Sequence, residues 1–286
     1  MKENLCIIGC GWLGKFAGLE LSSLFGKVYG SYRSEGTKNE LVTLNIEPFK
    51  LDLATDDSRV PEDILLSCKT VIITMPPFER QMPEIYGTKL AEIAHQFSSD
   101  TKFIFTSSTG VYPITEGFYN EEFECSERHI ICYAENQLRK VVQDRLAVLR
   151  LGGLFGAQRH PIKFLSGREM ATNGAEPIHL IHRDDIVRLI KHVLSGDLFP
   201  LLINVSYPLD ETKQSYYDHV AKKNALPLPK WGAAEGAKRV ISSDKLINLE
   251  GFNLIFNPWT LPLREIQSSL REEIAVLEQH LFKIYV

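Results

Sequence analysis

The stretch that most constrains the fold is Asn4–Gly14, where a short apolar run leads directly into three glycines, Gly9, Gly11 and Gly14. An amphipathic segment follows them. This order of buried strand, glycine-rich turn and helix, with the spacing Gly-x-Gly-x-x-Gly, is typical of a dinucleotide-binding turn. It predicts that the chain begins with a Rossmann-type α/β unit.

Each glycine has its own expected role in that turn. Gly9 permits the tight turn, Gly11 lets the backbone approach a pyrophosphate, and Gly14 lets the helix pack closely on the strand. The backbone at Trp12 and Leu13 would then present N–H groups and the positive end of the helix dipole to the phosphates. The pattern predicts dinucleotide binding, and the alternative is a strand–helix turn that binds nothing.

Composition bounds the class of protein. The chain has 286 residues, which suffices for one large core or for a domain with a smaller lobe. Its net charge of −4 argues against nucleic acid or an anionic membrane as partner. No apolar run is long enough to span a membrane, and no signal peptide is visible. The five cysteines lack metal-ligand spacing. We therefore expect reduced thiols, no metal site and a cytoplasmic protein.

The residue after the second strand of such a unit selects between NAD and NADP. An acid there would bind the ribose hydroxyls of NAD, whereas a cation would pair with the 2′-phosphate of NADP. Arg33 comes directly after the strand, ahead of Glu35, with Ser34, Thr37 and Lys38 as further donors. We therefore expect NADP in preference to NAD. The alternative is that Arg33 is a solvated loop cation.

Further along the chain, apolar and amphipathic stretches alternate. Strands are predicted at 27–32, 49–53, 70–74, 102–106, 146–150 and 202–205, and helices at 82–97, 186–194 and 213–224. The carboxyl ends of parallel strands border the ligand crevice. We therefore expect Asp52 and Leu53 beside the adenine and Pro76 in the wall of the cofactor channel. Alternatively, Asp52 only begins a turn and Pro76 only ends its strand.

The strand at 102–106 runs into Ser107–Pro113, which reads Ser-Ser-Thr-Gly-Val-Tyr-Pro. This stretch resembles the Ser-Ser-x-x-Val-Tyr sequence of the extended short-chain dehydrogenase/reductase superfamily, in its NAD-dependent epimerase/dehydratase group. The resemblance implies that Ser108 hydrogen-bonds the reacting oxygen and that Tyr133, 25 residues later, gives or takes its proton. Tyr112 is a candidate for substrate contact, although packing is the simpler role for it.

The chain departs from the family at the position one helical turn after Tyr133. The family has a lysine there, which holds the nicotinamide ribose and lowers the pKa of the tyrosine. Gln137 stands at this position and can hydrogen-bond the ribose without supplying charge. A tyrosine with an ordinary pKa of about 10 donates a proton better than it accepts one, which favours carbonyl reduction. Neither His129 nor Lys140 restores the family geometry by itself.

Two later stretches extend the resemblance. Arg150–Gly156, with Arg159 after it, is similar to the family sequence Arg-Leu-Gly-Gly-x-Tyr-Gly-Pro-x-Arg. The resemblance makes Arg159 a candidate for binding an anionic group of the substrate, and a surface loop arginine is the alternative.

The second of these stretches, 177–188, resembles the family segment Ile-His-x-Asp-Asp that precedes a helix. We expect Asp184 or Asp185 to be the N-cap of that helix, where negative charge is favourable. The alternative is that His182 or Asp185 is catalytic. His179 and His182 have no evident third partner for a metal.

These observations predict an α/β fold, a Rossmann-type doubly wound parallel sheet with a small C-terminal substrate lobe. Residues 1–160 would form the dinucleotide-binding domain, with 177–206 returning to it. Residues 161–176 and 207–286 would form the smaller lobe. Apolar positions from Leu263 to Ile284 recur at helical spacing, so we expect a long helix that packs on its own lobe or on another subunit.

The leading functional hypothesis is an NAD(P)-dependent oxidoreductase of the epimerase/dehydratase type. It would act on a carbonyl or hydroxyl of a small substrate, and the family's substrates are often nucleotide sugars. The partners expected are this small molecule and, at most, a second copy of the chain, so that the protein is a monomer or homodimer. The alternative hypothesis is a non-catalytic nicotinamide-dinucleotide sensor or regulatory protein with a degenerate active site. A scaffold that binds no dinucleotide is a third.

Overall fold

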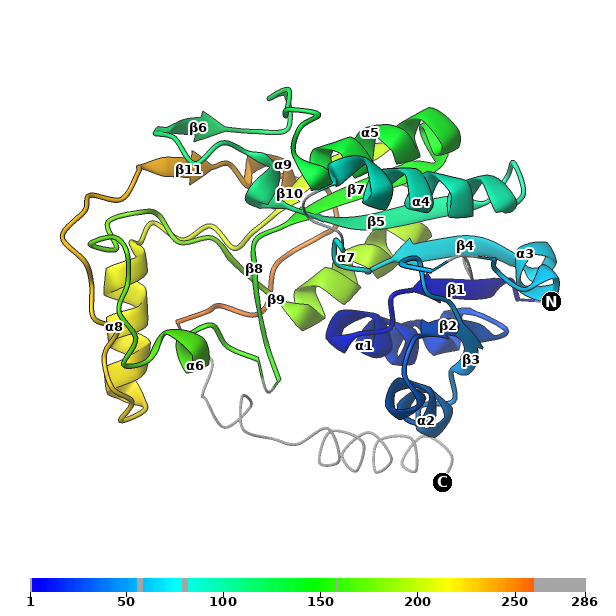
Figure 1. The fold of residues 1–286 in the computed structure, drawn as a ribbon, viewed down its shortest axis with the longest axis horizontal. Helices are drawn as coiled ribbons and strands as arrows, with labels where there is room; N and C mark the ends of the chain where they lie inside the picture. Colours follow the sequence, from blue (N-terminus) through cyan, green and yellow to red (C-terminus); the bar gives the residue numbers. More distant parts are fainter. Residues whose placement is uncertain (1, 56–58, 79–81, 158, 260–286) are drawn as a thin grey trace. The chain divides into compact units, whose positions relative to one another are not determined.

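Seven parallel strands form one sheet in the computed structural model, which describes residues 2–55, 59–78, 82–157 and 159–259. The sheet order is β10-β7-β5-β4-β1-β2-β3 (Figure 1). Its strands are β1 (Asn4–Ile8), β2 (Val28–Tyr32), β3 (Glu47–Lys50), β4 (Cys68–Ile73), β5 (Lys102–Ser108), β7 (Leu146–Leu151) and β10 (Leu201–Val205). The longer helices along these strands are α1 (Trp12–Leu21), α2 (Glu35–Thr43), α3 (Glu62–Ser67), α4 (Pro83–Gln96), α5 (Ile130–Val142) and α7 (Arg183–Ser195).

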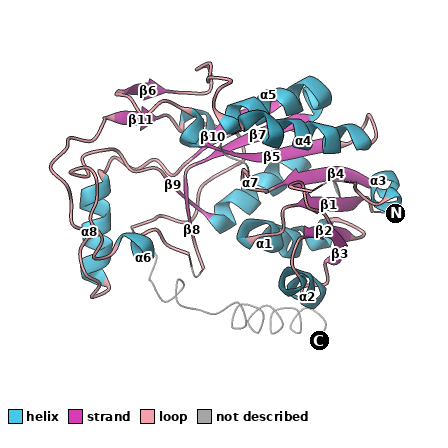
Figure 2. Cartoon of the chain, viewed as in Figure 1, coloured by secondary structure: helices cyan, strands magenta, loops and turns pink. Residues whose placement is uncertain are grey.

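The other strands of the described residues form two small parallel sheets. They pair β6 (Gly117–Tyr119) with β11 (Arg239–Ile241) and β8 (Gly153–Phe155) with β9 (Leu180–His182). The remaining helices are α6 (Ile162–Leu165), α8 (Lys213–Lys223) and α9 (Asp244–Ile247). Figure 2 shows that helices and strands lie close together around the large sheet, whereas longer loops run beside the small ones.

The large sheet is covered on both faces, which makes the fold doubly wound. Side chains alternate between faces along a strand. Cys6 and Ile8 of β1 belong to the apolar core that α3, α4 and α5 share with one face. Ile7 lies on the other face, where α1 packs so closely that a Cβ added to Gly18 would lie 3.1 Å from Ile7 and 2.6 Å from Ile46. The predicted fold class is therefore confirmed.

The chain divides into two compact units. Unit 1 comprises Met1–Pro113, Asn120–Leu151 and Val187–Val205, and unit 2 contains the rest. Residues 152–160 and 177–186, which the sequence assigned to the dinucleotide-binding domain, lie in unit 2. The difference arises because the chain leaves the large sheet where β7 ends, and β9 pairs with β8 rather than with a strand of that sheet.

Two local predictions differ from the structure. β3 ends at Lys50, so Asp52 and Leu53 lie in the turn that follows rather than in the strand. The amphipathic segment predicted over 263–284 lies outside the described residues. Within the described residues, no helix is both long and apolar enough to cross a membrane.

The predicted N-cap at Asp184 or Asp185 is wrong, because α7 starts at Arg183 and both aspartates lie in its first turn. Asp185 is fully buried and has a different partner. Its carboxylate accepts the backbone N–H groups of Ile255 and Phe256, each at 3.0 Å. Asp185 therefore ties a distant segment of unit 2 to the start of α7.

The expectation of five reduced thiols is also wrong for one pair. Cys125 and Cys132 form a disulfide, with their Cα atoms 6.1 Å apart. Cys6, Cys10 and Cys68 are free and buried. Burial raises the pKa of Cys10 to about 12 and that of Cys68 to about 11, so both stay protonated at neutral pH. Spacing in the sequence could not indicate the pair, because it depends on residues 120–129 folding back along α5.

The core of unit 2 contains a buried histidine, His160, with 2% of its surface exposed. Its Nδ1 accepts the backbone N–H of Ile162 at 3.2 Å, so the ring proton lies on Nε2, 3.0 Å from the Tyr216 hydroxyl. Burial lowers the pKa of His160 from 6.5 to about 4. The folded state therefore holds this imidazole neutral at physiological pH.

Because the unfolded chain protonates His160 near pH 6.5 and the folded chain only near pH 4, the free energy of unfolding should fall as the pH falls between these values. The contribution is about 1.4 kcal/mol per pH unit at most. His160→Gln should remove it. Urea unfolding followed by tryptophan fluorescence measures this, since Trp231 and Trp259 pack on the same core. The exposed His95→Gln control should keep the wild-type slope, and an equal slope in His160→Gln would contradict the prediction.

Candidate functional site

A cavity of about 550 Å³ in unit 1 lies at the carboxyl ends of the strands around β1. We call it the dinucleotide cavity. Its lining comes from the turn after β1, the end of β2 with the start of α2, the turn after β3, and the segment after β4. The residues are Gly9, Cys10, Gly11, Ser31, Tyr32, Arg33, Ser34, Thr37, Leu51, Asp52, Leu53, Met75, Pro76, Pro77 and Phe78. Ligands of open parallel sheets bind in this place.

The three glycines of the turn have distinct surroundings. Gly9 has a φ of +95°, and a Cβ there would lie 2.5 Å from the backbone nitrogen of Met75, so any other residue is excluded. A Cβ at Gly14 would lie 2.7 Å from the carbonyl oxygen of Gly9. A Cβ at Gly11 would meet nothing within 4 Å, because Gly11 faces the dinucleotide cavity. These surroundings agree with the tight-turn, close-packing and ligand-approach roles.

The N-terminus of α1 fits a phosphate group. Gly11 is its N-cap and supplies no side-chain hydrogen bond, and the first turn contains no acid. The first N–H groups of the helix and its positive dipole end are therefore not neutralised by a cap. Leu13 and Gly14 are buried and Trp12 is half-buried, and none of the three lines the cavity. Any contribution they make comes through the backbone.

Three donors group where the cavity meets α2. Arg33 is exposed, and Arg33, Ser34 and Thr37 all line the cavity. The Ser34 hydroxyl also caps α2 by accepting the Thr37 N–H at 3.3 Å. Glu35, the acidic alternative, does not line the cavity and instead pairs with Lys38 at 3.1 Å. Arg33, Ser34 and Thr37 therefore present a guanidinium and two hydroxyls to this part of the cavity.

The other predicted cofactor residues follow β3 and β4. Asp52 lines the cavity, and its carboxylate accepts the Ala54 N–H at 3.1 Å, so it also begins a turn as the alternative held. Leu53 is buried, with 2% of its surface exposed. Pro76 is exposed and lines the cavity together with Pro77. Contact of these residues with a cofactor stays a prediction.

The two predicted catalytic residues are both half-buried in unit 1. Ser108 ends β5, and its hydroxyl accepts the Gly110 N–H at 3.0 Å, which leaves its proton able to donate elsewhere. Tyr133 lies in the first turn of α5 with its ring against α4. A Cβ on Gly87 of that helix would lie 2.6 Å from Cδ1 of Tyr133. Gly87 therefore provides the space that the ring occupies.

The positions around Tyr133 supply no obvious substitute for the family lysine. Gln137 is half-buried one turn later on α5. The carbonyl of His129 accepts the Tyr133 N–H at 2.9 Å, and burial lowers the pKa of the His129 imidazole, which is therefore neutral at pH 7. Lys140 is exposed further along the helix. The expectation that neither residue restores the family geometry stands.

Polar side chains from the elements that carry Ser108 and Tyr133, and from neighbouring strands, form a buried hydrogen-bonded network. Glu135 is fully buried and binds Arg150 through two hydrogen bonds, at 3.0 Å from Nε and 2.7 Å from Nη2. It also accepts the Ser107 hydroxyl at 2.5 Å. Arg150 donates to the Tyr112 hydroxyl at 3.0 Å, which in turn donates to Asn204 at 2.7 Å. The network joins β5, α5, β7 and β10. Its member Ser107 directly precedes Ser108, and Glu135 comes two residues after Tyr133.

Sequence reasoning missed Glu135 and Arg150 as members of this network. A signal was available, because Arg150 interrupts an otherwise apolar strand and an arginine buried there needs a carboxylate. Tyr112 needs a correction. It is 1% exposed with its hydroxyl hydrogen-bonded to Asn204 and Arg150, so it packs in the core and does not line a substrate site.

Arg159 lies in unit 2 and is exposed. It closes a tight turn in which its backbone N–H and carbonyl pair with those of Gly156, both at 2.9 Å. Its contact with an anionic substrate group stays a prediction. Among the described residues, no cluster of three or more histidine, cysteine, aspartate or glutamate side chains could hold a metal ion.

Breaking the buried ion pair should destabilise unit 1. Glu135→Ala would leave the Arg150 guanidinium without its carboxylate in the core, so the free energy of unfolding should fall by about 3–5 kcal/mol. The double variant Glu135→Leu/Arg150→Met, which removes both charges, should recover most of the loss. Urea unfolding followed by circular dichroism measures both. Asp100→Asn, which breaks the exposed pair with Lys69, is the control and should change little. A Glu135→Ala variant as stable as this control would contradict the prediction.

Comparisons with known proteins place this geometry in context. No protein-family model matches the chain. Protein YeeZ of Escherichia coli K12 is 25% identical over 279 residues, which are 91% of this chain and 99% of YeeZ. UDP-glucuronic acid 4-epimerase from Bacillus cereus, solved in complex with NAD, has a TM-score of 0.70 at 14% identity and covers 89% of this chain and 93% of its own.

A second solved structure, dTDP-glucose 4,6-dehydratase from Bacillus anthracis in complex with NAD, has a TM-score of 0.71 at 14% identity and covers 97% of both chains. At this level of identity the likeness concerns the fold. The strand order with its two covered faces and the glycine turn after β1 agree with it. The chain therefore has the fold of the NAD-dependent epimerases and dehydratases, as its sequence motifs predicted.

Proposed function

We propose that this chain is an NADP-dependent oxidoreductase of the epimerase/dehydratase type. It would reduce a carbonyl of a small substrate, with sugar nucleotides as the first class to test. The observation that carries the proposal is the dinucleotide cavity, where an uncapped helix N-terminus, an open position at Gly11 and the donors around Arg33 converge. The printed names of the epimerase and dehydratase with this fold support the reaction class.

The chemistry of the side chains favours the reductive direction. Bound NADPH would supply the hydride. Ser108 would donate a hydrogen bond to the carbonyl oxygen while keeping its proton, since its oxygen accepts the Gly110 N–H and leaves the O–H free to donate. Tyr133 would give its proton to the same oxygen as charge develops there. Gln137 would hydrogen-bond the ribose, and His129, whose pKa is lowered by burial, would supply no positive charge to ionise the tyrosine.

The preference for NADP is supported by the residues of this chain alone. The related epimerase and dehydratase structures contain NAD. Arg33, Ser34 and Thr37 line the cavity where the 2′-phosphate of NADP would lie, whereas Glu35 does not. A guanidinium with two hydroxyls is a suitable donor set for a phosphate.

Calorimetric titration with NADPH and NADH tests this preference. We expect NADPH to bind about 10–100-fold more tightly, because charge-assisted hydrogen bonds contribute about 1.5–3 kcal/mol. Arg33→Asp should remove the advantage by repelling the 2′-phosphate, with little effect on NADH. Lys38, named above as a further donor, pairs with Glu35 and does not line the cavity, so Lys38→Ala is the matched control and should keep the wild-type ratio. Equal affinity of the wild-type protein for both nucleotides would contradict the NADP assignment.

The role of Tyr133 is tested by removing its hydroxyl. Tyr133→Phe should lower turnover of a carbonyl substrate by about 10²–10⁴-fold, the usual contribution of a general acid, with the Kd for NADPH unchanged. A panel of carbonyl compounds and sugar nucleotides, followed through NADPH absorbance, provides the assay. Tyr29→Phe, at a half-buried tyrosine on β2, should keep wild-type turnover. Full turnover in Tyr133→Phe would exclude this residue as the acid.

A second candidate function is a dinucleotide-binding sensor without catalysis. Gln137 in place of lysine and the neutral His129 favour it, because they leave Tyr133 without the family's means of activation. The sensor would bind NADPH as tightly as the enzyme but would turn over no member of the substrate panel. Failure to bind either nucleotide would exclude both functions.

A further inference from the structure

The disulfide between Cys125 and Cys132 lies at the start of the helix that carries Tyr133. Cys132 is in the first turn of α5, is fully buried and directly precedes Tyr133. Cys125 belongs to the segment before the helix and is half-buried. Cys132 is therefore enclosed by the core, whereas part of Cys125 is exposed at the surface of unit 1.

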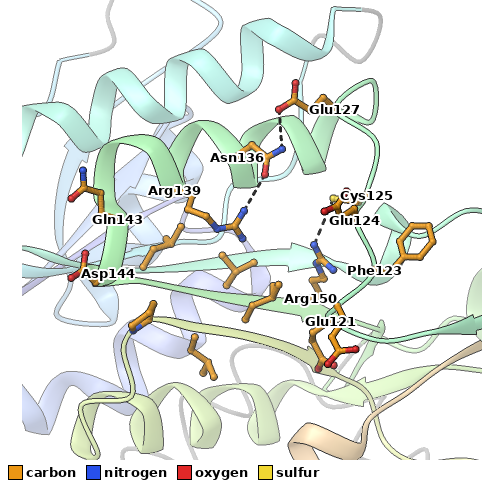
Figure 3. Close-up of a pocket in the computed structure, with 16 residues that line it drawn as sticks. Glu121, Phe123, Glu124, Cys125, Glu127, Asn136, Arg139, Gln143, Asp144 and Arg150 are labelled. Atoms are coloured by element: carbon orange, nitrogen blue, oxygen red, sulfur yellow. Dashed lines mark hydrogen bonds between the residues drawn. The ribbon is translucent and has the colours of Figure 1, made fainter.

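Cys125 lines a second cavity of unit 1, of about 840 Å³, bounded by α5, by β7 and β10, and by the segment 121–127. We call it the Cys125 cavity (Figure 3). It shares no lining residue with the dinucleotide cavity. Cys132 does not line it. A small molecule that enters the Cys125 cavity meets the sulfur of Cys125 and not that of its partner.

The cavity is acidic. Five carboxylates line it, from Glu121, Glu122, Glu124, Glu127 and Asp144. Two arginines line it as well, so the carboxylates outnumber the cations. Arg139 donates to Asn136 at 3.0 Å, and Arg150 is held by the buried Glu135. The electrostatic potential inside the cavity therefore favours a positively charged ligand.

The bridge is also in contact with the buried network. Figure 3 shows the Arg150 side chain directed toward Cys125, and its Nη2 donates to the Cys125 sulfur at 3.6 Å. The same guanidinium holds Glu135, which holds the Ser107 hydroxyl beside Ser108. A change at Cys125 is thus two contacts away from α5, which carries Tyr133, and three contacts away from Ser107, the neighbour of Ser108.

We propose that the Cys125–Cys132 disulfide is a site of thiol–disulfide exchange with small cationic thiols, which enter the Cys125 cavity and attack the sulfur of Cys125. The attacking thiolate forms a new S–S bond with Cys125, and the electron pair of the broken bond leaves on the Cys132 sulfur, which takes up a proton. A second small thiol then attacks the sulfur of the first one, which is bonded to Cys125, and the Cys125 thiol is released. In total, two thiols are oxidised to a small disulfide and the protein disulfide is reduced.

Exchange would alter the site that contains Tyr133. Breaking the bridge releases the first turn of α5 from the segment that precedes it, and the adduct on Cys125 lies beside Arg150. We expect turnover to change by about tenfold, because small displacements of a catalytic group have effects of this order or larger. This consequence rests on the proposed oxidoreductase function, whereas the exchange itself does not.

The experiment uses the full chain purified without reductant. It is exposed, at equal thiolate concentrations, to one cationic thiol, cysteamine, and to two anionic thiols, glutathione and 2-mercaptoethanesulfonate. Samples are quenched with N-ethylmaleimide in denaturant, so that the buried Cys132 can be labelled, and mapped by mass spectrometry. Each rate is normalised to the rate of the same thiol with a small soluble disulfide. We expect the thiol adduct on Cys125 and N-ethylmaleimide on Cys132, with cysteamine about tenfold faster than the anionic thiols. High salt should reduce this preference.

Three variants sharpen the test. Glu124→Gln/Glu127→Gln should lower the preference for cysteamine by removing two carboxylates of the lining. Cys132→Ser leaves Cys125 as a single thiol, which should react with cystamine in the folded protein. Cys68→Ser, at a buried free cysteine remote from the cavity lining, should leave all rates unchanged.

The proposal is overturned if the adduct forms on Cys132, if exchange occurs only in denaturant, or if both cysteines of the purified protein react with N-ethylmaleimide before any thiol is added. Exchange at Cys125 with unchanged turnover would remove its regulatory consequence. Exchange at Cys125 in a protein that binds neither NADPH nor NADH would retain the exchange site and reject the proposed oxidoreductase instead.

Discussion

The close approach of β1 to β4 at their carboxyl ends is the constraint on which unit 1 depends. With a φ of +95° and the nitrogen of Met75 only 2.5 Å from where a Cβ would be, Gly9 has no room for a side chain. Its N–H is bonded to Ser31 of β2 at 2.8 Å and its carbonyl to Thr74 at 2.5 Å, so one residue joins three neighbouring strands. The direction of α1, the position of its free N–H groups and the floor of the dinucleotide cavity all follow from this junction.

A second constraint is electrostatic and lies deeper in the sheet. Burying Arg150 and Glu135 costs desolvation energy, which their two hydrogen bonds and the further contacts to Ser107 and Tyr112 offset. Such a pair does little for net stability compared with apolar packing, but it admits few alternative arrangements. Its geometry relates the end of β5 to the start of α5, the two segments in which a Ser–Tyr pair would have to be aligned for proton transfer.

The fold was predictable wherever the information is local. The glycine turn, the buried strands and the order of strands and helices follow from patterns a few residues long, and they are confirmed. Contacts between residues far apart in the chain have no such local pattern in the sequence, so they could not be predicted from it. Asp185 has the appearance of a helix cap until its partner at Ile255, 70 residues later, is known. The Cys125–Cys132 bridge, the Glu135–Arg150 pair and the burial of Tyr112 depend in the same way on how segments fold together. The roles of Ser108, Tyr133 and Arg33 stay predictions, because they concern molecules other than this chain.

The division of the chain into units also bears on its synthesis. Unit 1 is built from Met1–Pro113, Asn120–Leu151 and Val187–Val205, and the chain departs to unit 2 between these pieces. β10, an edge strand of the large sheet, is therefore translated only after residues 152–186 of unit 2. Until then β7 has an unpaired edge, which is a known hazard for association between nascent chains. Neither unit corresponds to a continuous stretch of the gene, so neither could be transplanted or expressed by a single cut.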